Sequence, residues 1–411
     1  MPCNGINRQE RVLPISKKRL IFVRENHPDK KTMIDYTQIP SPCFVLDEKR
    51  LRENLTLIRS VKEHAQVEII LAFKAFAMWS VFPVIREYIR YSTASSVAEA
   101  QLAFEEMGNQ AHTYAPVYSD REFPSILRYS SHVTFNSLSQ FEHFYPQTQQ
   151  AEHPVSCGLR INPEYSSVST DLYNPCSPGS RLGVTAGQLE DSLPAGIDGL
   201  HFHTLCESQA EDLEQTLAAV EAKFGHLFNR IQWLNMGGGH LMTRKGYDVE
   251  QLIHILKTFQ AKYPHLQLIL EPGSAFAWET GELVSTVLDV VDNHGIKTAM
   301  LDVSFACHMP DCLEMPYKPK ILGAGEPVPG KPVYRMGGNS CLSGDYVGDW
   351  SFDKPLQPGD RIVFMDMMHY TMVKTTYFNG VTHPSIGIWR PDNRFQLVRE
   401  FGYEDYKNRL S

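Results

Sequence analysis

The sequence predicts an α/β protein in which a TIM-type (β/α)8 barrel is followed by a C-terminal β domain, either a sandwich or a barrel. Strand and helix patterns alternate regularly across residues 43–280, and beyond residue 281 short extended segments are separated by Gly and Pro. Eight β-α units in roughly 200–250 residues are typical of a TIM barrel. An open doubly wound sheet is the alternative, but no expected strand leads into a G-x-G-x-x-G turn.

The barrel strands are expected as short apolar runs and the helices as amphipathic segments. After a strand at 43–46, Asp47 is expected to cap a helix that carries Leu51, Leu55, Ile58 and Val61 on one face. Further helices are expected at 207–224 and 249–263. Eight barrel strands are expected at residues 67–73, 91–94, 112–116, 133–136, 155–161, 197–203, 231–236 and 267–270.

The β domain is expected to combine residues 33–42 with 281–411. Segments 283–291 and 296–303 flank Asn293-His294-Gly295, which is a hairpin signal. Further strands are expected at 332–336, 360–364 and 386–389. Residues 1–32 are polar and basic without periodicity, so we expect a disordered extension or a misassigned start codon there.

Composition indicates a soluble, cytoplasmic, globular protein. The 411 residues are 42% apolar, which suffices for a large core and two domains. No run is long enough to span a membrane and no signal peptide is visible. The eight cysteines are irregularly spaced, so we expect a reducing compartment and no metal. A net charge of −8 argues against nucleic acid as a binding partner and is compatible with a cationic small molecule as a ligand.

A lysine stands at the end of the first expected barrel strand. The apolar run 67–73 ends directly on Lys74. Desolvation lowers the pKa of a lysine and makes its amine a nucleophile, as Schiff-base formation requires. Taken alone, Lys74 is more simply interpreted as a strand-end lysine whose charged head reaches solvent. The other strand ends decide between these interpretations.

Three neighbouring strand ends carry residues suited to one ligand, and chemistry in a TIM barrel lies at the strand ends. His203 ends the sixth strand, Gly237, Gly238 and Gly239 follow the seventh, and Glu271 follows the eighth. Alone, each has a structural explanation as a core histidine, a turn or a helix cap. Together, they could bind one ligand: the glycine N–H groups can hydrogen-bond to a phosphate, and the imidazole can stack on an aromatic ring. The carboxylate can bind a protonated ring nitrogen. With Lys74, the set predicts pyridoxal 5′-phosphate as cofactor.

The motifs around these residues resemble those of the alanine-racemase-fold decarboxylases, which include ornithine and diaminopimelate decarboxylases. The likeness extends from about residue 40 to the end and includes Cys341, Tyr370-Thr371 and Phe378-Asn379-Gly380. Longer strings are most similar to the carboxynorspermidine decarboxylases: AFKAF at 72–76, HFHTLCE at 201–207, SFACHMPD at 304–311 and CLSGD at 341–345.

The resemblance implies a role for each matching residue. Lys74 is expected to bind the cofactor covalently, His203 to stack on its ring and Glu271 to bind the ring nitrogen. The three glycines and Tyr370 are expected to hold the phosphate.

It also implies a homodimer with shared active sites. Cys341 is expected to cross from the partner subunit and to protonate Cα after carbon dioxide leaves. The expected substrate is a cationic polyamine amino acid, carboxynorspermidine or carboxyspermidine, which is converted to norspermidine or spermidine. Residues expected to bind the polyamine are His308, Asp311, Glu314 and Asp345.

Two departures from the wider family narrow the substrate. Ornithine-type enzymes carry an arginine after Glu-Pro-Gly, where this chain has Ser274, and the Cys-Glu pair of diaminopimelate decarboxylases is replaced by Cys341-Leu342. A diaminopimelate, ornithine or arginine decarboxylase is the alternative. An amino-acid racemase would need an arginine at the ring nitrogen in place of Glu271. A non-enzymatic pyridoxal phosphate carrier would lack the β domain and Cys341.

Overall fold

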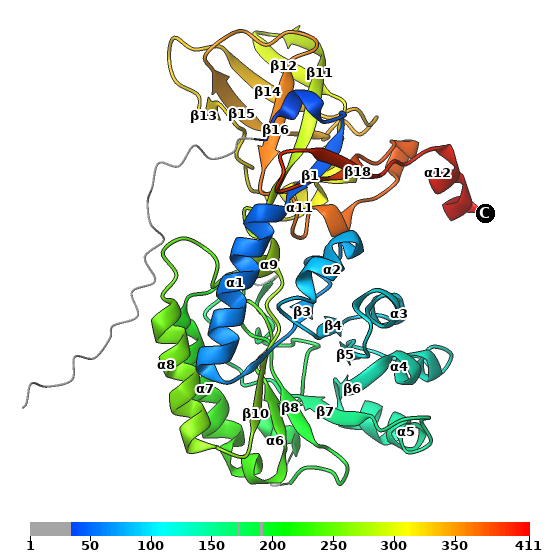
Figure 1. The fold of residues 1–411 in the computed structure, drawn as a ribbon, viewed down its shortest axis with the longest axis vertical. Helices are drawn as coiled ribbons and strands as arrows, with labels where there is room; N and C mark the ends of the chain where they lie inside the picture. The colour runs from blue at the N-terminus through cyan, green and yellow to red at the C-terminus, as the bar shows by residue number, and fades with distance from the viewer. Residues whose placement is uncertain (1–33, 169, 171–172, 190–191) are drawn as a thin grey trace, which may run out of the picture. The chain divides into compact units, whose positions relative to one another are not determined.

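The computed structural model describes residues 34–168, 170, 173–189 and 192–411, and two sheets organise this part of the chain (Figure 1). Our expectation for residues 1–32 lies outside the described residues. One sheet is parallel and belongs to the barrel, and the other is mixed and belongs to the C-terminal domain. No helix among the described residues is long and apolar enough to cross a membrane.

The parallel sheet closes on itself, which confirms the expected barrel. The first expected strand is present as two short pieces, β2 (Glu68–Ile69) and β3 (Leu71–Ala72), which pair with β10 and β4 respectively. Ile70 lies between them and donates its backbone N–H to Leu270 O. The other strands are β4 (Ser92–Ala94), β5 (Ala111–Tyr114), β6 (Ser130–Phe135), β7 (Ser156–Arg160), β8 (Gly199–His201), β9 (Trp233–Asn235) and β10 (Gln267–Leu270).

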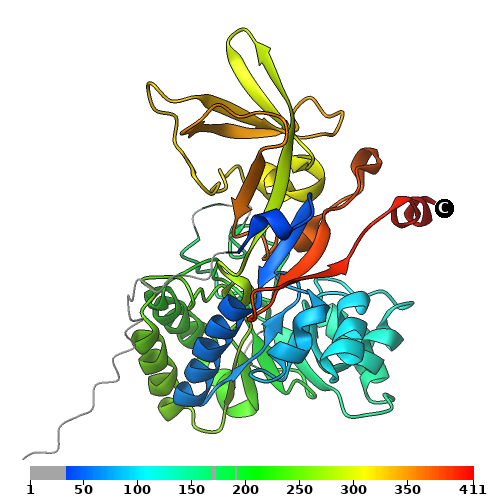
Figure 2. The same cartoon turned by 45° about the horizontal axis from the view of Figure 1, so that its top comes forward.

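Helices cover the outside of this sheet (Figures 1 and 2). The first begins as expected, because Asp47 Oδ1 accepts hydrogen bonds from the N–H groups of Lys49 at 2.9 Å and Arg50 at 3.2 Å. The apolar face of this helix is fully buried. The barrel helices are α1 (Glu48–Ala65), α2 (Phe82–Ile85), α3 (Val97–Leu102), α4 (Phe123–Tyr129), α5 (Leu138–Thr148), α6 (Ala186–Leu189), α7 (Ala210–Phe224), α8 (Val249–Lys262) and α9 (Ser274–Ala277).

One large side chain, Trp233, fills the barrel at the end away from the strand exits. Its ring lies so close to two strands that a Cβ added at Gly158 would stand 2.2 Å from it, and one added at Gly199 would stand 2.0 Å away. The ring also meets His132, which stacks on His112 with centroids 3.8 Å apart. This packed layer supports the polar residues at the strand ends.

The second sheet confirms the expected C-terminal sheet domain. Its strand order is β13-β15-β14-β12-β11-β1-β17-β18, with β16 paired to β11. The expected hairpin joins β11 and β12 through His294 and Gly295, both at positive φ. The strands are β1 (Cys43–Asp47), β11 (Gly281–Asn293), β12 (Ile296–Leu301), β13 (Ala324–Gly325), β14 (Val333–Gly337), β15 (Tyr346–Phe352), β16 (Arg361–Met365), β17 (Ser385–Trp389) and β18 (Phe395–Arg399).

Two details differ from our expectations. The domain is not wholly β, because it contains α10 (Phe305–His308), α11 (Pro310–Glu314) and α12 (Tyr403–Leu410). The barrel also does not begin at residue 43, since β1 pairs antiparallel with β11 and parallel with β17. The local pattern of β1 showed a buried strand but carried no information about which sheet would receive it.

Candidate active site

Lys74 follows β3 and meets His203, which follows β8. The Lys74 Nζ lies 3.0 Å from His203 Nε2, while His203 Nδ1 accepts the backbone N–H of Gly238 at 2.9 Å. This arrangement assigns the imidazole proton to Nε2, which then donates to the amine. Lys74 remains reachable by solvent, but surrounding protein lowers its pKa through desolvation, and the charge of Arg160 lowers it further. The pair therefore presents a neutral, nucleophilic amine.

The glycine turn after β9 packs tightly against the neighbouring strand ends. A Cβ on Gly238 would lie 2.4 Å from Glu271 O, and Gly239 has a φ of +90°. We expected all three glycine N–H groups to face a phosphate, but Gly237 N donates to Asn235 Oδ1 and Gly238 N to His203 Nδ1. Only the N–H of Gly239 has no partner among the described residues of this turn, because strand-end side chains take the other two.

Glu271 follows β10 and is held by the same turn. Its backbone N–H donates to Gly237 O at 2.8 Å, and its Oε1 accepts a 2.7 Å hydrogen bond from Asn235 Nδ2. Burial raises the pKa of the Glu271 carboxyl, while hydrogen bonds from the side chains of Asn235 and Thr93 oppose that rise. A bound cationic ring nitrogen would favour the ionised form in the same way.

A segment of the C-terminal domain reaches this cluster through Tyr370. The backbone N–H of Tyr370 donates to Ala75 O at 2.8 Å, beside Lys74. Burial raises the pKa of the Tyr370 phenol, so that it stays neutral and can donate a hydrogen bond. The structure therefore brings together Lys74, His203, the glycine turn, Glu271 and Tyr370.

Two of the expected polyamine-binding acids lie at the edge of this cluster. Asp311 Oδ2 accepts hydrogen bonds of 2.9 Å from Thr371 Oγ1 and from Tyr317 Oη. Its Oδ1 is buried and has no hydrogen-bond partner in the described part of the chain. Glu314 is exposed and forms an ion pair with Lys374.

The other two expected polyamine-binding residues have internal roles in the structure. His308 is fully buried, and its Nδ1 accepts the N–H of Ser304. Burial, together with His383, lowers the pKa of His308 to about 3. Asp345 is 5% exposed and accepts hydrogen bonds from Ala306 N and from Ser340 N and Oγ. The structure thus places both inside the fold, and the contacts of Asp345 with Ser340 hold the loop that carries Cys341.

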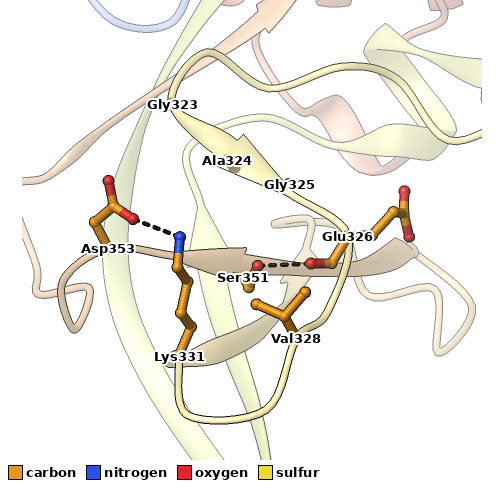
Figure 3. Close-up of a pocket in the computed structure, with 8 residues that line it drawn as sticks. All are labelled: Gly323, Ala324, Gly325, Glu326, Val328, Lys331, Ser351 and Asp353. Atoms are coloured by element: carbon orange, nitrogen blue, oxygen red, sulfur yellow. Dashed lines mark hydrogen bonds and ion pairs between the residues drawn. The ribbon is translucent and has the colours of Figure 1, made fainter.

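Cys341 is exposed, and its backbone N–H donates to Asn379 Oδ1 at 3.0 Å. Within the described residues, no hydrogen bond joins Cys341 to Lys74 or its neighbours. A separate pocket, lined by β13, the loop that follows it and the end of β15, contains none of the expected site residues (Figure 3). Its walls are held by an ion pair between Lys331 and Asp353.

Three further residues belong to the site: Arg160, which was not expected from the sequence, and His201 and Asn235, which were expected at strand ends but without a role. Arg160 Nη2 donates to His203 O at 3.2 Å and its guanidinium lies 4.6 Å from the Tyr114 ring centroid. All three stand at strand ends. His201 and Asn235 lie two positions before His203 and Gly237, and this spacing of two was the available signal, whereas the sequence carried no such signal for Arg160. No group of three or more His, Cys, Asp or Glu suited to a metal ion occurs among the described residues.

Comparisons with known proteins agree with this geometry. The family model described as "Pyridoxal-dependent decarboxylase, C-terminal sheet domain" matches residues 43–368. The chain belongs to the pyridoxal-dependent decarboxylases. Its cofactor is therefore pyridoxal 5′-phosphate and its activity is that of a decarboxylase, as the sequence predicted.

Close relatives of this decarboxylase have named activities. It is 53% identical to a carboxyaminopropylagmatine decarboxylase of Synechocystis, covering 91% of this chain and 96% of that one. It is 42% identical to a carboxynorspermidine/carboxyspermidine decarboxylase of Campylobacter jejuni, covering 91% and 99%. The crystal structure of carboxynorspermidine decarboxylase from Campylobacter jejuni with norspermidine matches with a TM-score of 0.83 at 40% identity, covering 90% and 100%.

The residues present fit the family's cofactor. Lys74 offers a neutral amine for covalent attachment, and Glu271 offers a carboxylate for the ring nitrogen. The turn at Gly238 leaves no room for a Cβ, so its backbone is free of side chains. His201, beside Glu271, has two buried ring nitrogens without partners in the described residues. This is a site built for a ligand with polar groups.

Proposed function

We propose that this enzyme decarboxylates a linear polyamine that bears an amino-acid group at one end, namely carboxynorspermidine or carboxyspermidine. The supporting observation is the neutral Lys74–His203 pair beside Glu271, in a chain 42% identical to an enzyme named for both substrates. Carboxyaminopropylagmatine is the second candidate, because the relative named for it is 53% identical. The three compounds share the reacting end and differ only in the cationic tail.

Each residue of the site has its own proposed role. Pyridoxal 5′-phosphate, when bound, supplies the electron sink that makes loss of carbon dioxide possible. Lys74 would hold the cofactor covalently through its neutral amine. Glu271 keeps a proton at the ring nitrogen, and His203 fixes the orientation of Lys74. The N–H of Gly239 and the Tyr370 hydroxyl hold the phosphate.

The proton for Cα and the contacts to the polyamine come from the C-terminal domain. Cys341 of a partner subunit is proposed as the proton donor, since the thiol is exposed and lies outside its own chain's cluster. Asp311, which has one buried oxygen without a partner in the described residues, is proposed to bind a substrate ammonium, and Glu314 is proposed to exchange its ion pair with Lys374 for one with the substrate.

Product analysis tests the proposal. The purified holoenzyme is incubated in parallel with carboxynorspermidine, carboxyspermidine, carboxyaminopropylagmatine, diaminopimelate, ornithine and arginine, and kcat/KM is measured from the amine formed. We expect one of the first two to have the highest kcat/KM. A higher value with carboxyaminopropylagmatine would establish the second candidate, and a preference for any of the last three would overturn both.

A further inference from the structure

His201 stands beside Glu271 without a hydrogen bond of its own. It is 2% exposed, and its Nε2 lies 3.7 Å from Glu271 Oε2. The ring packs at 5.3 Å from that of Tyr114, whose hydroxyl donates instead to Asn136 Oδ1. Neither nitrogen of His201 has a hydrogen-bond partner among the described residues. A buried N–H without a hydrogen-bond partner lowers the stability of the folded state. The position of the His201 ring, facing the Glu271 carboxylate, therefore needs an explanation.

The side chains of Asn235 and Thr93 both stabilise the ionised form of the Glu271 carboxylate. Oε1 accepts the hydrogen bond from Asn235, while Oε2 faces His201. Burial favours the protonated form of Glu271, and each donated hydrogen bond favours the ionised form that a ring N–H⁺ needs. A further hydrogen bond donated by His201 to Oε2 would therefore strengthen the ion pair between Glu271 and the ring nitrogen.

His201 can supply this donor without adding a charge. Burial lowers the pKa of its imidazole well below the ordinary value, and the charge of Arg160 lowers it further. The ring therefore stays neutral and carries one N–H. The separation of 3.7 Å is about half an ångström beyond a hydrogen bond, which a small rotation of the Glu271 carboxylate removes.

We propose that His201 is a positioning residue that donates its Nε2–H to Glu271 Oε2 when the cofactor's ring nitrogen engages Glu271. It keeps the carboxylate ionised and oriented, so that the shared proton stays on the ring nitrogen. Without this donor the carboxylate becomes more basic, and the proton moves from the ring nitrogen to Glu271. The inference deepens the proposed function and rests on the role given there to Glu271.

The test uses a matched pair of variants. Glutamine and methionine have similar length and flexibility, but only glutamine carries an N–H donor, so His201→Gln is compared with His201→Met. Each holoenzyme is loaded with 15N-labelled pyridoxal phosphate, and the 15N chemical shift of the ring nitrogen reports its protonation. Steady-state kcat and KM are measured on the same samples.

We expect wild type and His201→Gln to keep the ring nitrogen protonated at pH 7.5. In His201→Met the protonated fraction falls, and kcat falls by about 10- to 100-fold with little change in KM, in line with the loss of one hydrogen bond to a charged group. If His201→Met does not fold, His201→Phe serves as the variant without a donor. Equal behaviour of the two variants, with the ring nitrogen still protonated, would overturn the proposal.

Glu271→Gln separates this inference from the proposed function. A Glu271→Gln enzyme with a protonated ring nitrogen and near-normal turnover would remove the role of Glu271, and that of His201 with it. A loss of the ring proton in Glu271→Gln, but not in His201→Met, would remove His201 alone.

Discussion

The amine of Lys74 is kept reactive by its contact with a neutral histidine. His203 is committed through Nδ1 to the N–H of Gly238, so only its Nε2–H can meet the lysine. A charged lysine would place two donors against each other. The backbone of the glycine turn thereby sets the protonation state of Lys74 through one imidazole ring.

Replacing Lys74 should abolish both catalysis and covalent attachment of the cofactor. We expect Lys74→Ala to lower kcat/KM by about three orders of magnitude or more, because the displaced nucleophile has no substitute in the site. Borohydride reduction followed by peptide mass analysis measures the attachment. The exposed Lys49→Ala is the control and should behave as wild type. Covalent cofactor on another lysine of Lys74→Ala would contradict the assignment.

At the scale of single elements, the turn after β9 depends on the absence of side chains. We expect Gly238→Ala to weaken cofactor binding by about tenfold or more, because its Cβ would stand 2.4 Å from Glu271 O and overpacking typically costs about 1–3 kcal/mol. Fluorescence titration of the cofactor-free protein measures the affinity. Gly187→Ala, with nothing within 4 Å of the new Cβ, is the matched control. Equal affinities of the two variants would contradict this account.

The neighbouring strands β5 and β6 predict how stability depends on pH. Burial lowers the pKa of His132 to about 4 and that of His112 well below 6.5. The unfolded chain therefore binds more protons than the folded chain below about pH 6.5. We expect the free energy of unfolding to fall between pH 6.5 and 4, by at most about 1.4 kcal/mol per pH unit for each histidine.

Denaturant unfolding at several pH values checks this expectation. His132→Phe keeps an aromatic ring beside Trp233 but removes one titrating group, so its stability should depend less steeply on pH. The exposed His226→Ala should leave the slope unchanged. Equal slopes in wild type and His132→Phe would show that His132 does not contribute.

Local sequence patterns predicted where strands and helices occur better than they predicted which strands pair. The strand at 67–73 was visible because all its residues except Glu68 are apolar, and Lys74 directly after it meets His203. The sheet that receives β1 was not predictable, since Cys43 pairs with Val284 and Ser385, far along the chain. The internal hydrogen bonds of Asp345 were not predictable for a related reason, because the sequence shows a carboxylate but not the N–H groups from which it accepts.

At the scale of the whole molecule, we expect one active site to need two chains. Cys341 is exposed and lies on the C-terminal domain, while Lys74 lies at the strand exits of the barrel. Mixing inactive Lys74→Ala with inactive Cys341→Ala, under conditions of subunit exchange, should restore about a quarter of wild-type activity. Half of a random mixture is heterodimer, and each heterodimer has one intact site of two.

A matched mixture controls this experiment. Lys74→Ala mixed with the double variant Lys74→Ala/Cys341→Ala cannot form an intact site and should stay inactive. Failure of the first mixture to recover, despite exchange shown by mass spectrometry, would place Cys341 in its own chain's site or outside the chemistry.

The pairing of β1 also affects how the protein folds during its synthesis. Synthesis proceeds at about 5–20 residues per second, so Cys43 leaves the ribosome roughly 10 to 50 s before its partner Val284 is translated. During that interval a strand whose five residues all end up buried is without its sheet. The barrel can close once β10 has emerged, but its N-terminal neighbour must wait for the C-terminal domain. Newly made chains are therefore exposed to aggregation through β1, and a chaperone that shields its residues would raise the yield of native enzyme.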